Sequence, residues 1–196
     1  MRIVSADEAV SGIESGQQIY IQCAAATPSV LLDALCRRAS GLEDVKVVHL
    51  HCEGPHPHLA PEMEGHLFHR ALFIGPNARA AINEGRAEFI PVQLSDVPLL
   101  MESGLLPLDA VFANMAPPDD HGFCSLGTSV ESMQTAIRCA KTVIAQLNKS
   151  MPRTHGDSYV HVSQIDLAVE VDQAPYVYSA GEIGRASCRE RVYGPV

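Results

Sequence analysis

The stretch that decides the fold is residues 109–170, DAVFANMAPPDDHGFCSLGTSVESMQTAIRCAKTVIAQLNKSMPRTHGDSYVHVSQIDLAVE. Residues 108–115 are an apolar run of strand length that ends before two prolines, which have no N–H to donate to a sheet. Apolar residues then recur on one face of a predicted helix that begins near Thr128 and Glu131, a pair with capping-box spacing. Residues 142–147 form a continuous apolar run, as expected of a strand buried on both faces of a parallel sheet. The stretch therefore predicts a strand–loop–helix–strand unit with a right-handed crossover.

The loop between this strand and this helix, residues 117–128, is a candidate ligand site. Ligands of open α/β sheets bind beyond the carboxyl ends of the strands. The loop supplies Gly122 and Gly127, which allow a close backbone approach, and the hydroxyls of Ser125 and Thr128. The free amides at the start of the following helix suit an anionic group. Most Gly-rich loops of this kind are only turns, so the spacing by itself does not assign a ligand.

The rest of the chain repeats the same alternation. Ser5 and Glu8 have capping-box spacing and open a short helix that is expected to end at Gly16, and Thr27 and Pro28 are predicted to be the N-cap and first residue of the next helix. Further strands are expected at residues 18–23, 45–52, 67–74 and 87–94, and further short helices after Pro76 and Ser95. Residues 53–65 are rich in Pro, His and Glu and predict an exposed loop. The predicted fold class is α/β, with a mostly parallel sheet and helices on both faces.

The composition is that of a globular protein. With 196 residues, 46% of them hydrophobic, the chain can bury one α/β core. Its formal net charge of −9 argues against a nucleic-acid or acidic-membrane partner. It has no apolar run that would span a membrane, and Met1 leads directly into the first helix, so we expect a cytoplasmic protein. The six cysteines have the spacing of neither a disulfide framework nor a zinc site and are expected to be reduced.

Several ordered blocks resemble the N-terminal domain of the acetyl-CoA hydrolase/transferase family, which includes the 4-hydroxybutyrate and butyrate:acetate CoA-transferases. They are PPDDHGFCSLGTSVE (117–131), AKTVIAQLN (140–148) and MPRTHGDSYVHVSQID (151–166). The segment IYIQCAAATPSVLLDAL (19–35) is similar to the first strand, loop and helix of the family, with Pro28 in the expected place. The resemblance covers most of residues 1–172 and implies the Rossmann-like N-terminal domain of a CoA-transferase.

The resemblance also implies a reaction, the movement of coenzyme A from an acyl-CoA such as acetyl-CoA to a short-chain carboxylate through a glutamyl-CoA intermediate. In this family the nucleophilic glutamate and the Gly-rich CoA-binding segment lie in a second, C-terminal domain. No catalytic residue is therefore expected here, Glu131 is interpreted as a helix cap, and the 196-residue chain alone is expected to be inactive. Coenzyme A is a substrate, no cofactor is expected, and the full-length enzyme is expected to be a homodimer. Acetyl-CoA hydrolysis and a non-catalytic α/β binding domain are the alternatives.

On this interpretation the present domain supplies one wall of the active-site cleft. Loops 23–28 and 120–128 both leave the carboxyl ends of predicted strands. We predict substrate contacts in them at Ala25, Pro28, Gly122 and Ser125. The alternative is that both loops pack against the second domain and touch no ligand.

Two further groups have mainly structural interpretations. Arg153 and Asp157 lie in a turn and could pair with each other or with the second domain. A salt bridge or loop brace is expected rather than a substrate contact. A nucleophile made of Cys124 and His121 is not expected, because the tight loop that holds them does not require the two side chains to meet.

A cluster of potential metal ligands lies in residues 49–69. It comprises His49, His51, Cys52, His56, His58, His66 and His69. Zinc would need three or four of them to converge, and only His49 and His51 are expected to share a strand face. We therefore predict no metal site, and interpret these histidines as partly exposed polar side chains.

The end of the chain breaks the pattern. Residues 182–192, EIGRASCRERV, resemble the translation of a sequencing adapter and are basic in an acidic chain. We expect the natural sequence to end near Gly181, so that residues 1–181 are a truncated N-terminal domain. A natural basic tail is the alternative.

Overall fold

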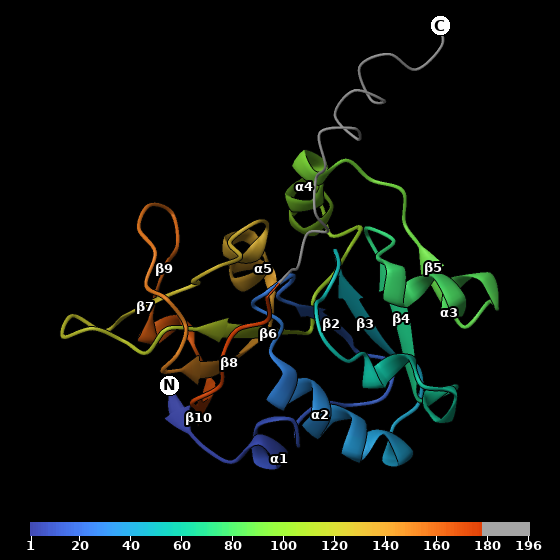
Figure 1. Cartoon of the computed structure of the whole chain (residues 1–196), viewed down its shortest axis with the longest axis horizontal. Coiled ribbons are helices and arrows are strands. Elements are labelled where there is room, and N and C mark those ends of the chain that lie inside the picture. The colour runs from blue at the N-terminus through green and yellow to red at the C-terminus, as the bar shows by residue number, and fades with distance from the viewer. Residues whose placement is uncertain (178–196) are drawn as a thin grey trace, which may run out of the picture.

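A parallel sheet forms the centre of residues 1–177, the part of the chain that the computed structural model describes (Figure 1). In this part, eight strands pair in the order β1-β10-β8-β6-β2-β3-β4-β5, and every pairing is parallel. The strands are β1 (Arg2–Ile3), β2 (Gln18–Ile21), β3 (Val45–His49), β4 (Leu67–Ala71), β5 (Ala87–Phe89), β6 (Ala110–Met115), β8 (Thr142–Asn148) and β10 (Leu167–Val171). A small antiparallel pair joins β7 (Phe123–Ser125) to β9 (Tyr159–His161). The predicted α/β fold with a mostly parallel sheet is confirmed.

Helices pack against both faces of the sheet. They are α1 (Ala6–Ala9), α2 (Ser29–Arg38), α3 (Arg79–Asn83), α4 (Val97–Glu102) and α5 (Met133–Cys139). On β6, Phe112 packs into the core with α1 and α2, while Val111 and Ala113 pack into the core with α4 and α5. Successive side chains of a strand point to opposite faces, so the apolar run of β6 contributes to both cores. All of β6, and all of β8 except Thr142, is buried as predicted.

Element ends differ from the prediction where the chain leaves the sheet. Strands β2, β3, β4 and β5 all stop before the end of their apolar runs, and the following apolar residues lie in loops at the carboxyl edge. Ser5 caps α1 as predicted, its Oγ accepting from the Glu8 amide at 3.2 Å, but the helix ends at Ala9 rather than at Gly16. The N-cap of α2 is Pro28 rather than Thr27.

The capping box predicted at Thr128 and Glu131 does not form. Helix α5 begins only at Met133, and its N-cap, Ser132, makes no capping hydrogen bond with its side chain. The Glu131 carboxylate instead accepts from the Cys23 amide and the Ser129 hydroxyl. The interpretation of Glu131 as a helix cap is therefore wrong, because a tertiary contact takes the carboxylate that local spacing assigns to the helix.

The connection from β3 to β4 contains no α-helix. Two single-turn 3₁₀ helices, Pro57–Leu59 and Pro61–Met63, occupy it, and the first packs on β4 and α2. This segment was predicted to be an exposed loop, yet His58 within it is buried.

No helix in residues 1–177 has the length and apolar character that crossing a bilayer requires. The boundary predicted at Gly181 and the adapter-like residues 182–196 lie outside the described residues.

Candidate functional site

The strand order places a topological switch point between β2 and β6. The chain continues from β2 to its neighbour β3 on one side, and from β6 towards β8 on the other. The loops that follow β2 and β6 therefore begin at the point of the carboxyl edge where open α/β sheets commonly bind ligands. These are the two loops, 23–28 and 120–128, that the sequence predicts to form the cleft wall.

A buried amide holds the two loops together. Gln22, directly after β2, is fully buried. Its Nε2 donates to the carbonyl oxygens of Leu126 at 2.9 Å and Ser129 at 2.7 Å, and its Oε1 accepts from the Asn114 amide of β6 at 2.6 Å. Because each of these groups would be costly to bury unpaired, Gln22 fixes the position of the β6 loop relative to β2.

The backbone of the β2 loop is strained at Ala24, which has a φ of 52° although it carries a side chain. The surrounding hydrogen bonds impose this conformation. The Ala24 amide donates to His51 O at 2.7 Å, and Ala24 O accepts from the Thr27 hydroxyl at 2.7 Å and the Glu53 amide at 3.3 Å. Strained backbone that its surroundings hold in place is found at ligand sites, which agrees with the location of this loop.

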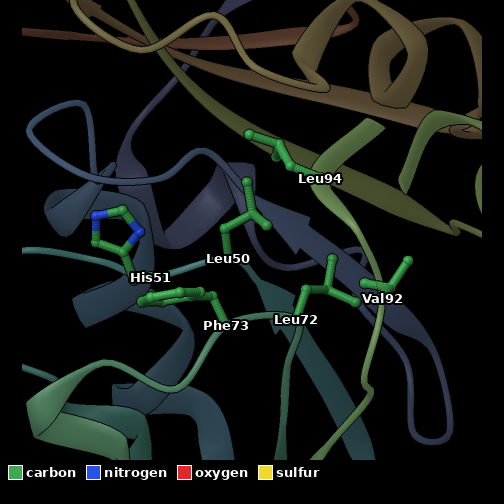
Figure 2. A pocket seen from close by; sticks show the side chains of 6 residues that line it. All are labelled: Leu50, His51, Leu72, Phe73, Val92 and Leu94. Carbon is green, nitrogen blue, oxygen red and sulfur yellow. The ribbon is translucent and has the colours of Figure 1, made fainter. Parts of the chain in front are cut away.

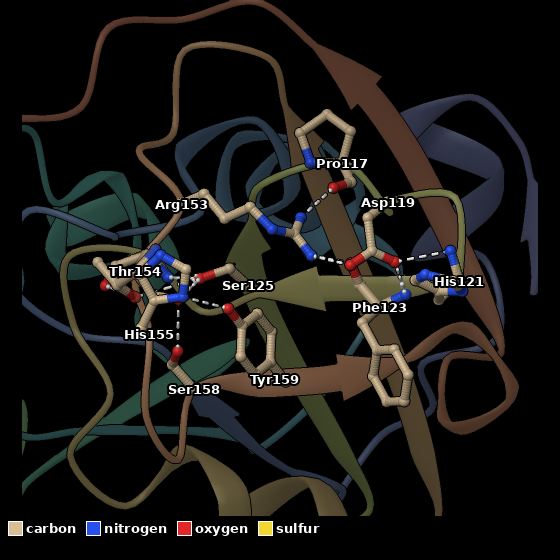
Figure 3. Close-up of polar contacts among 11 residues, drawn as sticks. Pro117, Asp119, His121, Phe123, Ser125, Arg153, Thr154, His155, Ser158 and Tyr159 are labelled. Carbon is tan, nitrogen blue, oxygen red and sulfur yellow. Dashed lines mark hydrogen bonds and ion pairs between the residues drawn. The ribbon is translucent and has the colours of Figure 1, made fainter.

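Arg153 braces the loop after β6 (Figure 3). Its guanidinium pairs with Asp119 at 2.6 Å and donates to the carbonyl oxygens of Phe123 at 2.7 Å and Pro117 at 3.2 Å. The Phe123 amide above all, and then the His121 amide and the Arg153 charge, hold the pKa of Asp119 below its ordinary value. The expected loop brace is confirmed, but the partner of Arg153 is Asp119 and not Asp157.

Of the four predicted substrate contacts, the two in the β6 loop support the loop itself. Ser125 is fully buried, and its Oγ accepts from the Thr154 amide at 3.0 Å and the Gly127 amide at 3.3 Å. Gly122 has a φ of +82°, and a side chain there would come within 2.9 Å of the His161 ring.

The two predicted contacts in the β2 loop differ from each other. Ala25 is half-buried and lines a cavity of about 410 Å³ together with Ala24, His51, Glu53, Phe73, Gly75 and Pro76. Pro28 is buried behind it at the start of α2. Among the predicted contacts, Ala25 is therefore the residue that reaches open space.

A second cavity, also of about 410 Å³, shares His51 and Phe73 with the first (Figure 2). Its other lining residues are Leu50, Leu72, Val92 and Leu94. The rings of His51 and Phe73 lie 5.8 Å apart between the two cavities, and Phe73 is 59% exposed. The paired cavities thus form an apolar hollow along the carboxyl ends of β2 to β5, with one imidazole and one carboxylate on its walls.

The residues of this hollow after β3 and β4 are not predicted from the sequence. The apolar pattern places the dipeptides Leu50-His51 and Leu72-Phe73 within the strands, but each directly follows the last strand residue. The rule that selected the β2 and β6 loops applies equally to them. If each strand were predicted to end at its last paired residue, the two dipeptides would be recognised as part of the site.

The thiol of Cys124 is not an activated nucleophile. The side chain is buried, and burial raises its pKa to about 11. His121 is exposed, and its backbone amide donates to Asp119. A thiol with so high a pKa is protonated at neutral pH and attacks poorly, as expected from the sequence.

Three histidines come together on the face of the sheet that α2 covers. His49, His58 and His69 are buried, with one ring nitrogen of each within 4.8 Å of the others. Burial is the main cause that lowers the pKa of all three, and the neighbouring histidines lower it further. The pKa of His69 falls to about 4, although the Val47 backbone has a smaller effect in the opposite direction. The prediction of partly exposed polar side chains is wrong for these three. His51, predicted to share a strand face with His49, lies beyond the end of β3 in the apolar hollow.

Comparison with known proteins assigns the family. The acetyl-CoA hydrolase/transferase N-terminal domain matches residues 1–177. The succinyl-CoA:acetate/propanoyl-CoA:succinate CoA transferase of Fasciola hepatica is 42% identical over 161 residues, which are 81% of this chain and 33% of that protein. The 4-hydroxybutyrate coenzyme A transferase of Clostridium kluyveri is 38% identical over 169 residues, 86% of this chain and 39% of that protein. The chain thus spans between a third and two fifths of the length of these relatives.

Solved structures share the fold. The 4-hydroxybutyrate CoA-transferase of Porphyromonas gingivalis is 31% identical with a TM-score of 0.78, over 92% of this chain and 42% of that one. RipA of Yersinia pestis is 25% identical with a TM-score of 0.84, over 94% of this chain and 45% of that one. The chain therefore belongs to the acetyl-CoA hydrolase/transferase family, and its residues 1–177 correspond to the N-terminal domain of that family.

Proposed function

We propose that this chain is the N-terminal half of a CoA-transferase that moves coenzyme A between a short acyl-CoA, such as acetyl-CoA, and a short-chain carboxylate. The observation that carries the proposal is the apolar hollow at the carboxyl ends of β2 to β5, next to the switch-point loops, in a chain of this family. A short acyl chain is apolar and needs such a wall, while the reacting carbonyl must stay accessible to a nucleophile.

The proposed nucleophile is a glutamate in the part of the relatives that this chain does not span. Its carboxylate attacks the thioester carbonyl, the CoA thiolate leaves, and an acyl-glutamyl anhydride forms. The thiolate then attacks the glutamyl carbonyl, which releases the acyl group as a carboxylate and leaves a glutamyl-CoA thioester. An incoming carboxylate reverses these steps. In the described residues, Glu131 is held by two hydrogen bonds, and Glu53 is the glutamate that lines the hollow.

The predicted substrate-contact residues enter the proposal with different roles. Ala25 is proposed to contact the substrate from the edge of the hollow. Pro28, Gly122 and Ser125 are proposed to act by holding the two loops in shape, because Pro28 and Ser125 are buried and Gly122 sits in a turn.

The rim of the hollow also fits a missing partner domain. Phe73 and Leu94, which line it, each expose 59% of their surface. Apolar side chains gathered beside a cavity mark a surface that another domain or a ligand covers. The C-terminal half of the relatives is the proposed cover, and it would close the hollow into the active site.

A chimera tests the proposal. Residues 1–177 are joined to the C-terminal remainder of the Porphyromonas gingivalis enzyme, and CoA transfer from acetyl-CoA to butyrate or 4-hydroxybutyrate is measured. We expect turnover, and inactivation by borohydride when acetyl-CoA is added alone, since borohydride reduces a glutamyl-CoA thioester. The variant Glu53→Gln should still form that thioester, and the 196-residue chain alone should show no turnover.

The alternatives give other results. Release of CoA without an acceptor acid would indicate an acetyl-CoA hydrolase. A chimera that folds, judged by circular dichroism, but binds no acyl-CoA would indicate a non-catalytic domain and overturn the proposal. Turnover by the 196-residue chain alone would show that the nucleophile lies within it.

A further inference from the structure

The three buried histidines come from three different elements and meet at one point. His49 ends β3, His69 is the central residue of β4, and His58 lies in the 3₁₀ turn that covers these strands. Val47 pairs with His69 across the sheet, so His49, two residues along, points to the same face as His69. The ring centroids are 4.4 Å apart for His49 and His69, 5.2 Å for His58 and His69, and 5.6 Å for His49 and His58.

The cluster has polar atoms that nothing in the described chain satisfies. The three residues are only 1%, 2% and 1% exposed, and none of their six ring nitrogens makes a hydrogen bond of acceptable geometry with the described residues, although the Val47 backbone lies near the His69 ring. Buried polar groups in folded proteins nearly always have partners, because leaving them unpaired costs free energy. If the imidazole rings only filled space in the core, they would stabilise the fold less than leucine or phenylalanine at the same positions. Three of them facing one another therefore call for a shared partner.

We propose that His49, His58 and His69 form a binding site for a first-row divalent metal ion, with Zn²⁺ the ion that suits the donor set best. Imidazole nitrogen is a preferred zinc ligand, and three histidines are a known zinc donor set. Nitrogens about 2.0–2.1 Å from a tetrahedral ion lie roughly 3.4 Å from one another. The three ring nitrogens now lie within 4.8 Å of one another, so small movements of the rings would bring them to the distances that bonding requires.

His56 lies beside the three proposed ligands. Its ring centroid is 5.6 Å from that of His58 and 6.0 Å from that of His49. Its Nδ1 lies 2.9 Å from the Gly54 carbonyl oxygen, and a backbone carbonyl on the other ring nitrogen commonly orients histidines that bind metals. His56 is therefore a candidate donor for the fourth coordination position.

The position of the site suggests a structural role. The connection from β3 to β4 has no α-helix to cover the sheet, and within its two 3₁₀ turns the buried residue is His58. An ion bound by one residue of the turn and two of the sheet would fasten this connection to the core. Bound metal should then stabilise the fold, because it binds the folded chain more tightly than the unfolded one.

The site can be tested on the 196-residue chain, purified without a histidine tag. Zinc content is measured by mass spectrometry, affinity by competition with a chromophoric chelator, and the midpoint of thermal unfolding with and without Zn²⁺. The variants are His58→Gln, which removes one proposed ligand, and His66→Gln, which removes an imidazole from the same segment but outside the cluster. His66 binds the Leu42 carbonyl oxygen through Nδ1 at 2.7 Å.

We expect one zinc ion per chain, a thermal midpoint raised by zinc, and an affinity lowered at least about tenfold by His58→Gln but little by His66→Gln. Equal zinc affinity in the folded wild-type chain and His58→Gln would overturn the proposal. If His58→Gln does not fold, X-ray absorption of the wild-type chain loaded with Zn²⁺ decides the matter. A shell with three imidazoles supports the site, and an oxygen-rich shell or no bound zinc refutes it.

Discussion

The Glu131 carboxylate accepts a hydrogen bond from the Cys23 backbone amide across 3.2 Å, joining the segment before α5 to the loop after β2. Its second oxygen accepts from the Ser129 hydroxyl at 2.6 Å. Together with the buried amide of Gln22, this carboxylate fixes the two loops that border the switch point. The shape of the candidate site therefore depends on side chains that do not face the cavities.

Replacing Glu131 should weaken this link. Glu131→Ala leaves the Cys23 amide without its partner, and hydrogen bonds to a charged group contribute about 1.5–3 kcal/mol. We expect the free energy of unfolding, measured by urea titration, to fall by about that amount, and by less in Glu131→Gln, which keeps an acceptor. Glu62→Ala, at an exposed position, is the matched control. Equal stability of Glu131→Ala and the control would show that the contact contributes nothing.

Asp119 should make stability depend on pH in the acid range. Its folded pKa lies below the ordinary value of 3.8, because the Phe123 amide, the His121 amide and Arg153 all favour the charged form. The carboxylate thus stabilises the fold above that value, and the contribution is lost as pH falls through the folded pKa. Asp119→Asn should lose less stability than the wild type between about pH 6 and about pH 2.

The pKa of Asp119 also shows how much the two backbone amides and Arg153 each contribute to stabilising its charged form. In Arg153→Met the two amide donors remain, so NMR titration should show the pKa of Asp119 rising only part of the way to its ordinary value. A return to the ordinary value would mean that the guanidinium, and not the Phe123 amide, dominates. The exposed Asp120 offers a carboxylate for comparison in the same spectrum.

The sequence predicted the central strands because their signal is local. The apolar run around Phe112 is continuous, as is typical of a strand buried on both faces. Glu131 shows the limit of this reasoning, since its spacing from Thr128 fits a helix cap while its partner, Cys23, lies 108 residues away. His49 and His69 meet only through the register of β3 on β4, which no short pattern in the chain encodes. Residues were predicted well where neighbours in sequence determine the environment, and poorly where strand order does.

Buried cysteines should resist alkylation in the folded chain. Burial, as the main cause, raises the pKa of Cys23 far above the usual range, that of Cys52 to about 12 and that of Cys124 to about 11. Since the thiolate is the reactive form, iodoacetamide at about pH 7.5 should leave these three unmodified in native protein and modify them in urea. Peptide mass spectrometry gives the result residue by residue. Fast labelling of Cys124 in native protein would contradict the burial of β7.

Gly127 should tolerate no side chain while Met151 is present. Its φ is +68°, and a Cβ would clash with Met151 Sδ and lie 3.3 Å from the Pro152 carbonyl oxygen. Gly127→Ala should therefore lower the free energy of unfolding by roughly 1–3 kcal/mol. Met151→Ala alone should cost about 2–5 kcal/mol, because Met151 is buried. In the double variant the clash with Met151 is gone, while the backbone strain and the close Pro152 carbonyl oxygen remain. The destabilisation of the double variant should therefore fall short of the sum of the two single effects by at least about 0.5 kcal/mol. Gly12→Ala, which has open space around it, controls for the change of residue type, and full additivity would place Met151 away from the β6 loop.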